Sequence, residues 1–298
     1  MRYLVIFLLV TVFSSCKKNE DDSSDSTNPP SEAKLIFKFN FDSTQTRLNN
    51  FGSATGVPAG HGAQSPRFNV MSAHYIELAP DSLTLLGGGD VLYRAPEVTT
   101  GGALAIDFSQ AVLAPDGGIF FSIPLSQVNP GTYKWLRISL AYQNYDIDYR
   151  FTYSSVTYDA VGTIASFIGF NTYIQNYTVN DSSLAINANK QQGYWGFEST
   201  VLGLTSISQG QAPPGATTVP NPISSTSPIP AGSCVVTGRF DIPLVVSASE
   251  TTDRTITVTV STNKSFEWLE HSNPLYFEPL DGDTVIDMGV RGIEPHVQ

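Results

Sequence analysis

The sequence is poor in charged residues and in basic residues above all. Only 14% of its 298 residues are charged, whereas an average soluble domain is nearer ~25%. So low a fraction excludes a solvated helical protein or a coiled coil. The 16 Lys and Arg are outnumbered by 27 Asp and Glu, which gives a formal net charge of −11. A chain with this balance lacks the basic surface that nucleic-acid binding requires, so we expect no nucleic-acid partner.

Long apolar runs and paired cysteines are also missing. A membrane-spanning helix needs about 20 apolar residues, and the run at residues 4–13 is ten residues long. Because this run follows a basic residue, it predicts a cleaved secretory signal over residues 1–15. The sequence Phe13-Ser14-Ser15-Cys16 resembles a bacterial lipobox, which implies that this cysteine is lipidated and becomes the mature N-terminus. Cys234 is the only other cysteine, so we expect no intramolecular disulfide.

The segment after the lipobox has almost no apolar side chains. Residues 16–33 are therefore predicted to be a lipidated cysteine followed by a disordered acidic tether. The run Lys17-Lys18-Asn19-Glu20-Asp21-Asp22 resembles the export signal of Bacteroidota surface lipoproteins. This resemblance implies an outer-membrane protein that is anchored in the lipid bilayer through the acylated Cys16 and faces the cell exterior. A generic polar spacer on a lipoprotein that faces the periplasm is the alternative.

Amphipathic helical patterns longer than one or two turns are absent from the remainder, where short alternating apolar runs are separated by turn residues. These runs predict strands at residues 35–41, 133–142, 149–158, 162–173, 234–246, 254–261 and 284–290. Many short strands without intervening helices predict an all-β fold. We expect an antiparallel β-sandwich of jelly-roll or Ig-like type, with little or no helix outside the signal peptide.

A proline-rich segment interrupts this rhythm at residues 209–233, which contain six prolines. We interpret residues 34–298 as a single β-sandwich domain in which this segment is a long ordered loop, since proline lowers the entropy lost on ordering. The alternative is an interdomain linker. That reading would leave a C-terminal fragment of about 65 residues, which is small for an independent domain without a disulfide.

Aromatic residues are concentrated in residues 133–177, where there are twelve. On a strand, Tyr149, Phe151 and Tyr153 share one face, and their rings would suit stacking on sugars. The polar residues 143–148 predict a turn that exposes Tyr145. The candidate ligand-binding residues are Tyr145, Asn144, Asp146, Asp148 and Tyr149, whose polar groups can hydrogen-bond to the hydroxyls of a glycan. The alternative is that the rings pack against one another as cross-strand pairs.

The common metal-binding signatures HxH, HxxxH, HExxH and CxxC are missing. His61, Met71 and His74 form the nearest set of nitrogen and sulfur ligands, which would suit copper. Residues 131–140 resemble one strand of the MbnP-like secreted copper-binding family, but the His-rich pattern of that family is not present around them. Asp281, Asp283 and Asp287 could supply oxygen ligands to calcium, although Asp-Gly-Asp before a strand is also an ordinary turn. We expect no cofactor and keep a copper-binding lipoprotein as the alternative function.

Catalytic signatures are missing too. The chain has no Gly-x-Ser-x-Gly sequence, and Cys234 has no histidine near it in the sequence. Glycosidases use two carboxylates, and the adjacent acid pairs are Asp146 and Asp148, Glu267 and Glu270, and Asp281 and Asp283. Such pairs arise by chance among 27 acids, so we do not expect an enzyme, and a hydrolase is a minor alternative. The sequence predicts a surface lipoprotein with a non-catalytic binding role toward a glycan or another cell-surface component, with a structural or adhesive surface protein as a further alternative.

Overall fold

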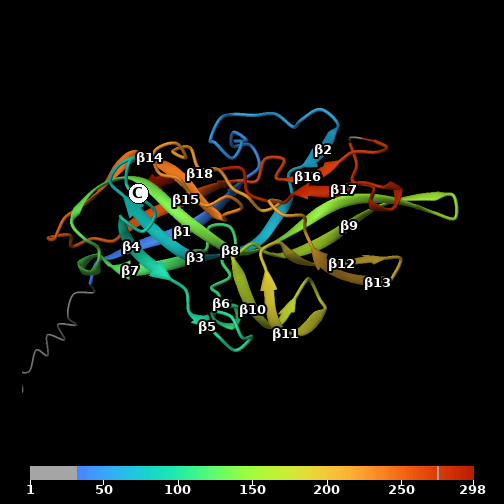
Figure 1. The fold of residues 1–298 in the computed structure, drawn as a ribbon, viewed down its shortest axis with the longest axis horizontal. Coiled ribbons are helices and arrows are strands. Elements are labelled where there is room, and N and C mark those ends of the chain that lie inside the picture. Colours follow the sequence, from blue (N-terminus) through green and yellow to red (C-terminus); the bar gives the residue numbers. More distant parts are fainter. Residues whose placement is uncertain (1–31, 274) are drawn as a thin grey trace, which may run out of the picture. The chain divides into compact units, whose positions relative to one another are not determined.

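In the computed structural model, the described residues are 32–273 and 275–298. The predicted signal peptide, Cys16 and nearly all of the predicted tether lie outside them. The described residues form an all-β fold (Figure 1), which confirms the predicted class. Their only helical segments are three-residue 3-10 turns, η1 (Phe108–Gln110), η2 (Leu125–Gln127) and η3 (Pro279–Asp281). In this part of the chain we find no helix with the length and apolar character to cross a membrane.

The strands form four sheets, and residues Glu32–Gln298 group as one unit. The sheet orders are β18-β15-β1-β7, β13-β12-β9-β8-β3-β4 with β14 paired to β8, β11-β10-β6-β5, and β17-β16-β2. Most pairs are antiparallel, but β1 with β15 and β6 with β10 are parallel. The strands are β1 (Lys34–Asp42), β2 (His61–Gln64), β3 (Arg67–Ala79), β4 (Asp90–Arg94), β5 (Glu97–Val98), β6 (Ala105–Asp107), β7 (Ile119–Pro124), β8 (Gly131–Tyr153), β9 (Val156–Phe167), β10 (Asn171–Thr178), β11 (Ser183–Gln191), β12 (Tyr194–Val201), β13 (Leu204–Gln211), β14 (Val235–Val246), β15 (Arg254–Ser261), β16 (Phe266–Leu269), β17 (Thr284–Asp287) and β18 (Ile293–Val297).

The first core is a sandwich between the sheet that contains β1 and the part of the largest sheet formed by β3, β8 and β14. The period-2 pattern of apolar residues in β1 and β15 explains which side chains enter this core. Leu35, Phe37 and Phe39 on β1 are fully buried, as are Ile256 and Val258 on the neighbouring β15. The predicted period-2 faces of these two strands are therefore confirmed.

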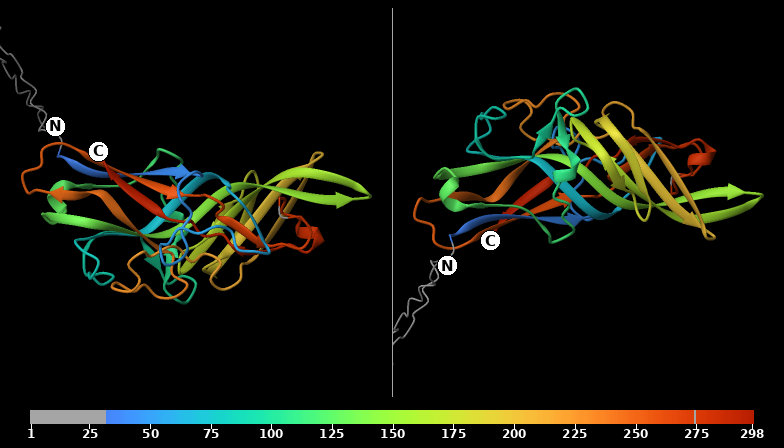
Figure 2. Two further views of the ribbon diagram at one scale, coloured as in Figure 1. Left: turned by 90° about the horizontal axis from the view of Figure 1, so that it is seen from above. Right: turned by 90° about the horizontal axis from the view of Figure 1, so that it is seen from below.

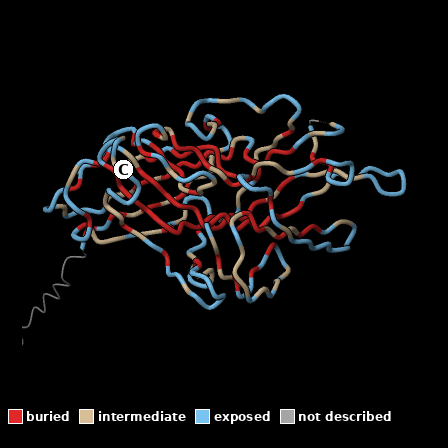
Figure 3. Tube along the Cα trace, in the orientation of Figure 1, coloured by how far each residue is buried: buried red, intermediate tan, exposed pale blue. Residues whose placement is uncertain are grey.

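Strand β8 is 23 residues long and extends from the first core into two smaller ones. Alternate residues of a strand point to opposite faces, so β8 and β9 contribute to a different core on each face. The second core, on one face, contains Tyr145, Ile147, Ile164, Phe266 and Trp268. The third core, on the other face, contains Tyr142, Phe167, Ile174, Tyr177 and Tyr194. Buried segments run through the middle of β8, whereas the tip of the β8–β9 hairpin is exposed (Figure 3).

The predicted turn at residues 143–148 is wrong, because this segment lies in the middle of β8. Its polar side chains find partners across the sheets: Gln143 Nε2 donates to Met288 O at 2.7 Å, and Asn144 Nδ2 donates to Val179 O at 2.7 Å. The chain reverses instead at Ser154 and Ser155. Both residues have positive φ, 49° and 65°, as the tight turn of a two-residue hairpin requires.

The predicted strand 162–173 is also two strands, β9 and β10, which belong to different sheets. The break follows Phe167, where the backbone N–H groups of Ile168 and Gly169 both donate to Ala141 O, at 2.9 and 3.0 Å. This shared carbonyl turns the chain away from the largest sheet.

The proline-rich segment 209–233 begins with the last three residues of β13, and the part after Gln211 lies against the body of the protein. Ser227 is fully buried, and its hydroxyl donates to Thr84 O at 2.5 Å. Ser227 Oγ also accepts a hydrogen bond from Arg137, whose guanidinium lies 3.3 Å from the carboxylate of Glu77. Both charged side chains are fully buried. This ion pair thus connects the long loop to β3 and β8.

Candidate functional site

Two adjoining cavities, of about 400 and 470 Å³, lie along the β8–β9 and β12–β13 hairpins beside the loop that contains η3. Both are lined by Tyr149, Phe197 and Pro279, so we treat them as one site and call it the aromatic groove. Its rings are Tyr149, Phe151, Tyr153, Tyr158, Trp195, Phe197, Phe266 and Phe277. Its wall therefore comes from three separate parts of the sequence.

The outer part of the aromatic groove is a row of parallel rings on the β8–β9 hairpin. The Tyr149 and Phe151 centroids are 5.8 Å apart, and those of Phe151 and Tyr158 are 5.3 Å apart, both pairs with an interplanar angle of 19°. Phe151 and Tyr158 are directly paired across the two strands. Tyr153, at the end of the row, is 71% exposed. The predicted common face of Tyr149, Phe151 and Tyr153 is realised here, since all three line the groove.

The inner part of the aromatic groove opens onto the second core. Ile147, Ile164, Phe266 and Met288 form its apolar floor. Its polar side chains are few and mostly uncharged: Ser208, Gln211 and Thr284 line the inner cavity, and Ser199 and Ser206 line the outer one. A largely apolar hollow with a small number of polar groups is typical of ligand-binding sites.

Asp283 is the only charged residue among those described that line the aromatic groove. Its Oδ1 accepts from the backbone N–H of His271 at 3.0 Å, and its Oδ2 accepts from that of Glu278 at 2.7 Å. Both oxygens thus hold the loop around η3 in place. Leu280, within that loop, is 72% exposed at the mouth of the groove.

Of the five candidate ligand-binding residues, only Tyr149 lines the aromatic groove. Its hydroxyl donates to Ser199 Oγ at 3.0 Å. Tyr145 is 1% exposed and packs between Phe68 and Phe266 in the second core, with ring centroids 5.0 and 6.4 Å away. The expectation that Tyr145 is exposed is therefore wrong. Burial raises the pKa of its hydroxyl well above the usual value.

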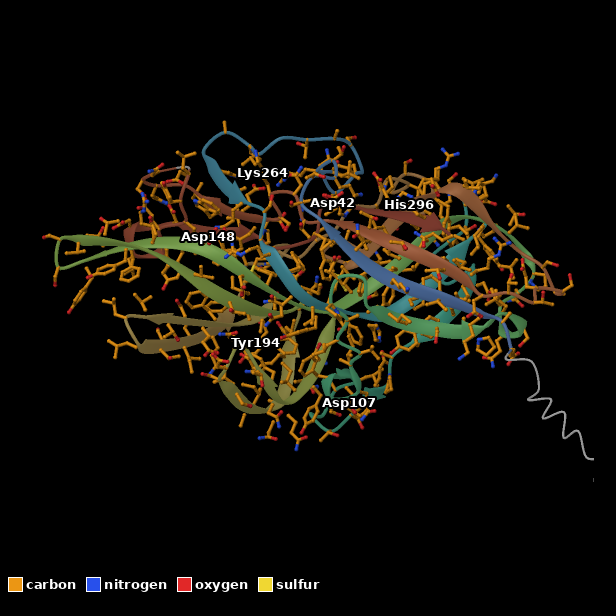
Figure 4. The ribbon with its side chains drawn as sticks, turned by 180° about the vertical axis from the view of Figure 1, so that it is seen from behind. Asp42, Asp107, Asp148, Tyr194, Lys264 and His296 are labelled. Atoms are coloured by element: carbon orange, nitrogen blue, oxygen red, sulfur yellow. The ribbon has the colours of Figure 1, made fainter. Side chains whose placement is uncertain are left out.

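The three polar candidates have even numbers on β8 and point away from the aromatic groove. Asn144 is buried. Asp146 accepts from Thr163 Oγ1 at 2.7 Å. Asp148 forms a two-point pair with Arg67, with both N–O distances at 3.0 Å. Figure 4 labels Asp148 on β8, and Tyr194, whose ring belongs to the third core, on β12. These polar groups are engaged in bonds within the protein.

The three candidate copper ligands, His61, Met71 and His74, lie in different surroundings and do not form one site. His61 Nδ1 lies 2.5 Å from Glu267 Oε1, and His74 Nε2 lies 3.0 Å from Glu97 Oε1. Met71 is fully buried in the first core. Burial lowers the pKa of His74. Within residues 32–273 and 275–298, no three His, Cys, Asp or Glu side chains are grouped as a metal ion would need.

Three further candidate acids (Asp283, Asp287 and Glu270) and the thiol of Cys234 are engaged in bonds within the protein. Asp287 Oδ1 accepts from the backbone N–H of Gly289 at 2.8 Å and from Arg291 at 2.7 Å, while both oxygens of Asp283 hold the η3 loop, so the calcium hypothesis gains no support. Glu270 accepts from Trp268 Nε1 at 2.9 Å. Cys234 is buried, and burial raises the pKa of its thiol. An unreactive thiol of this kind is usually a packing residue.

Sequence reasoning missed Trp195, Phe197 and Phe277, which lie outside the aromatic-rich region. The signal for two of them is present, because Trp195 and Phe197 alternate along a short strand and share a face with Ser199. Their pairing with the β8–β9 hairpin is long-range and has no local signature. Comparison with protein families, with curated proteins and with solved structures gave no match to this chain.

Proposed function

We propose that this chain is an outer-membrane lipoprotein, anchored through an acylated Cys16, that binds a glycan in the aromatic groove without catalysis. The observation that carries this proposal is the row of parallel, partly exposed rings of Tyr149, Phe151 and Tyr158. The apolar C–H face of a sugar packs on such rings.

The polar groups beside the rings fit the same kind of ligand. Ser206, Ser208, Gln211 and Thr284 can exchange hydrogen bonds with hydroxyl groups, and none of them carries a charge. The one charged side chain among the described residues of the groove is Asp283, whose two oxygens are bonded to backbone N–H groups, so the lining favours a neutral ligand over a charged one. The groove offers no pair of free carboxylates, which a glycosidase would require.

The aromatic groove lies far from the point at which the chain enters this unit. Strand β1 begins at the end of this unit remote from the β8–β9 hairpin tip (Figures 1 and 2). The groove is therefore not next to the point where the proposed tether would join the unit.

The binding test uses a glycan array followed by calorimetry with the strongest hit. We expect Phe151→Ala and Tyr158→Ala each to weaken binding at least about 10-fold, equivalent to about 1.4 kcal/mol, because each removes a stacking surface. Tyr173→Ala is the matched control, since this partly exposed tyrosine on β10 does not line the groove. The proposal is refuted if no glycan binds, or if both groove variants bind the hit as tightly as the unmodified protein.

The anchoring part of the proposal has its own test. Metabolic labelling with an alkyne-modified fatty acid should mark the protein, and Cys16→Ser should abolish the label and release the protein from the membrane fraction. Protease treatment of intact cells should remove the protein from the surface. Protection from protease until the outer membrane is permeabilised would instead place the protein in the periplasm.

A further inference from the structure

A second hollow, of about 660 Å³, lies where the ends of β11 and β13 meet the start of β10. Five amide side chains line it, and we call it the amide groove (Asn171, Asn189, Gln191, Gln192 and Gln211). No charged side chain is among the described residues that line this hollow. An ionic ligand would find no counter-charge there, so the amide groove suits a neutral ligand.

The amide groove and the aromatic groove lie on opposite faces of the β12–β13 hairpin. Directly paired residues on neighbouring strands point to the same face. Ser208 pairs with Phe197, which lines the aromatic groove. Gln211 pairs with Tyr194, which belongs to the third core on the other face (Figure 4). Gln211 and Ala212 lie at the edge between the two hollows and line both, and the other lining residues of each hollow are different.

The amide orientations are fixed by backbone carbonyls. Asn171 Nδ2 donates to Leu104 O at 2.8 Å, Asn189 Nδ2 donates to Ala103 O at 2.9 Å, and Gln211 Nε2 donates to Gln192 O at 2.6 Å. A carbonyl can only accept a hydrogen bond. The NH₂ group of each amide must therefore face its carbonyl, and the assignment of oxygen and nitrogen is not arbitrary.

In these amides a side-chain N–H group is used within the protein, whereas two of the side-chain oxygens are free to accept. The side-chain oxygens of Asn171 and Gln211 have no hydrogen-bond partner within residues 32–273 and 275–298. A ligand in the amide groove can therefore donate hydrogen bonds to these oxygens. Hydroxyl groups do so without bringing a charge, which points to a polyhydroxylated molecule.

An exposed ring stands beside these acceptors. Phe170 lines the amide groove and is 47% exposed. On its other side the ring packs near His74, with centroids 5.5 Å apart. A fixed, half-exposed ring next to hydroxyl-binding oxygens provides the two contacts that a pyranose offers, an apolar face and an equatorial set of hydroxyls.

We infer that the amide groove is a second binding site, which takes a neutral, polyhydroxylated segment of a glycan. This inference rests on the proposed function of the protein in glycan binding, but it uses different residues. One chain would then hold two glycan segments on the two faces of the β12–β13 hairpin. Two sites on one rigid support raise the apparent affinity for a branched or multi-chain glycan.

The test uses the full-length protein with four probes: maltohexaose, cellohexaose, xylohexaose and mannohexaose. Saturation-transfer NMR detects binding, and calorimetry gives the number of sites per chain. We expect a member of this panel to bind at two sites per chain. Phe170→Ala should remove one site or weaken it at least 10-fold, and Phe170→Trp should preserve it because the ring surface is kept. Phe151→Ala should affect only the other site. Phe51→Ala is the control, since this phenylalanine is 71% exposed and lies outside both grooves.

Three results would overturn the inference. The first is a single site that Phe151→Ala abolishes and Phe170→Ala leaves intact, which would leave the proposed function standing. The second is tighter binding of oligogalacturonate than of the neutral panel in a manner that depends on Phe170, which would contradict the neutral ligand. The third is the absence of any saturation transfer from the neutral panel to the unmodified protein.

Discussion

The buried pair of Arg137 and Glu77 allows a quantitative prediction about stability. Arg137 donates to Leu85 O at 3.1 Å and Thr84 O at 2.5 Å, and it also donates to Ser227 Oγ. On the other side of the pair, Glu77 accepts from the backbone N–H of Gly89 at 2.8 Å and that of Gly87 at 3.1 Å, and from the hydroxyl of Tyr75 at 2.9 Å. The pair therefore holds two loops, at residues 84–89 and around Ser227, against β3 and β8.

The substitution Arg137→Met removes the charge while keeping most of the volume. It leaves Glu77 buried without its counter-ion, and it removes one of the two hydrogen bonds accepted by each of the carbonyl oxygens of Thr84 and Leu85. Breaking a buried pair in this way costs about 3–5 kcal/mol, out of a total stability of about 5–15 kcal/mol. With a urea m-value of about 3 kcal/mol/M, the unfolding midpoint should fall by roughly 1–1.7 M.

Urea unfolding followed by circular dichroism measures this loss. Arg239→Met is the control, because Arg239 lies exposed on the adjacent β14, and its substitution should change stability by less than about 0.5 kcal/mol. The double variant Glu77→Leu with Arg137→Met should recover part of the loss, since it removes both charges. The reasoning is refuted if the urea midpoint of Arg137→Met is close to that of the control. It is also refuted if the double variant loses as much stability as Glu77→Leu and Arg137→Met lose together as single variants.

Two further predictions concern the region below the aromatic groove. Burial raises the pKa of Asp287 to about 6, so between about pH 4 and pH 6 the folded state holds more protons than the unfolded state, and stability falls as the pH rises through that range. Asp287→Asn should flatten this decline in urea midpoints measured from pH 4 to pH 7, and an unchanged slope would contradict the assignment. A Cβ at Gly62 would lie 2.3 Å from the ring of Trp268, so Gly62→Ala should lower stability by about 1–3 kcal/mol through overpacking. Gly56→Ala, where the Cβ meets nothing within 4 Å, is its control, and equal thermal midpoints for the two variants would argue against close packing at Trp268.

The parts of the fold that the sequence predicts well are those that depend on local patterns. Leu35, Phe37 and Phe39 recur at every second position, and this period of two predicts which face of β1 is buried. The same holds for β15, where the predicted and observed bounds agree. Periodicity of two is a property of the strand itself, so it survives whichever neighbour the strand receives.

The failed predictions concern polar residues whose partners lie far along the chain. Residues 143–148 have the composition of a turn, yet Gln143 bonds to a carbonyl 145 residues away. No pattern in the neighbouring sequence indicates a partner so far along the chain. The true turn at Ser154 and Ser155 lacks the Asn-Gly or Gly-Gly signature of its type, so it gave a weaker signal than the polar strand.

The error over the turn also explains why the candidate site contained both tyrosines and acids. In a turn, neighbouring side chains such as Tyr145, Asp146 and Asp148 can converge on one ligand. In a continuous strand they cannot, because successive side chains point to opposite faces. Extending the alternation through β8 sends Asp148 to Arg67 on one face and Tyr149 to the row of rings on the other. Because β8 is one continuous strand, its aromatic and acidic side chains lie on opposite faces, and only the aromatic ones line the groove. The groups that can bind hydroxyls in the groove come from β12, β13 and β17. For a protein that binds neutral glycans this separation is favourable, since the carboxylates of β8 are kept out of the groove and their charges are bonded within the protein.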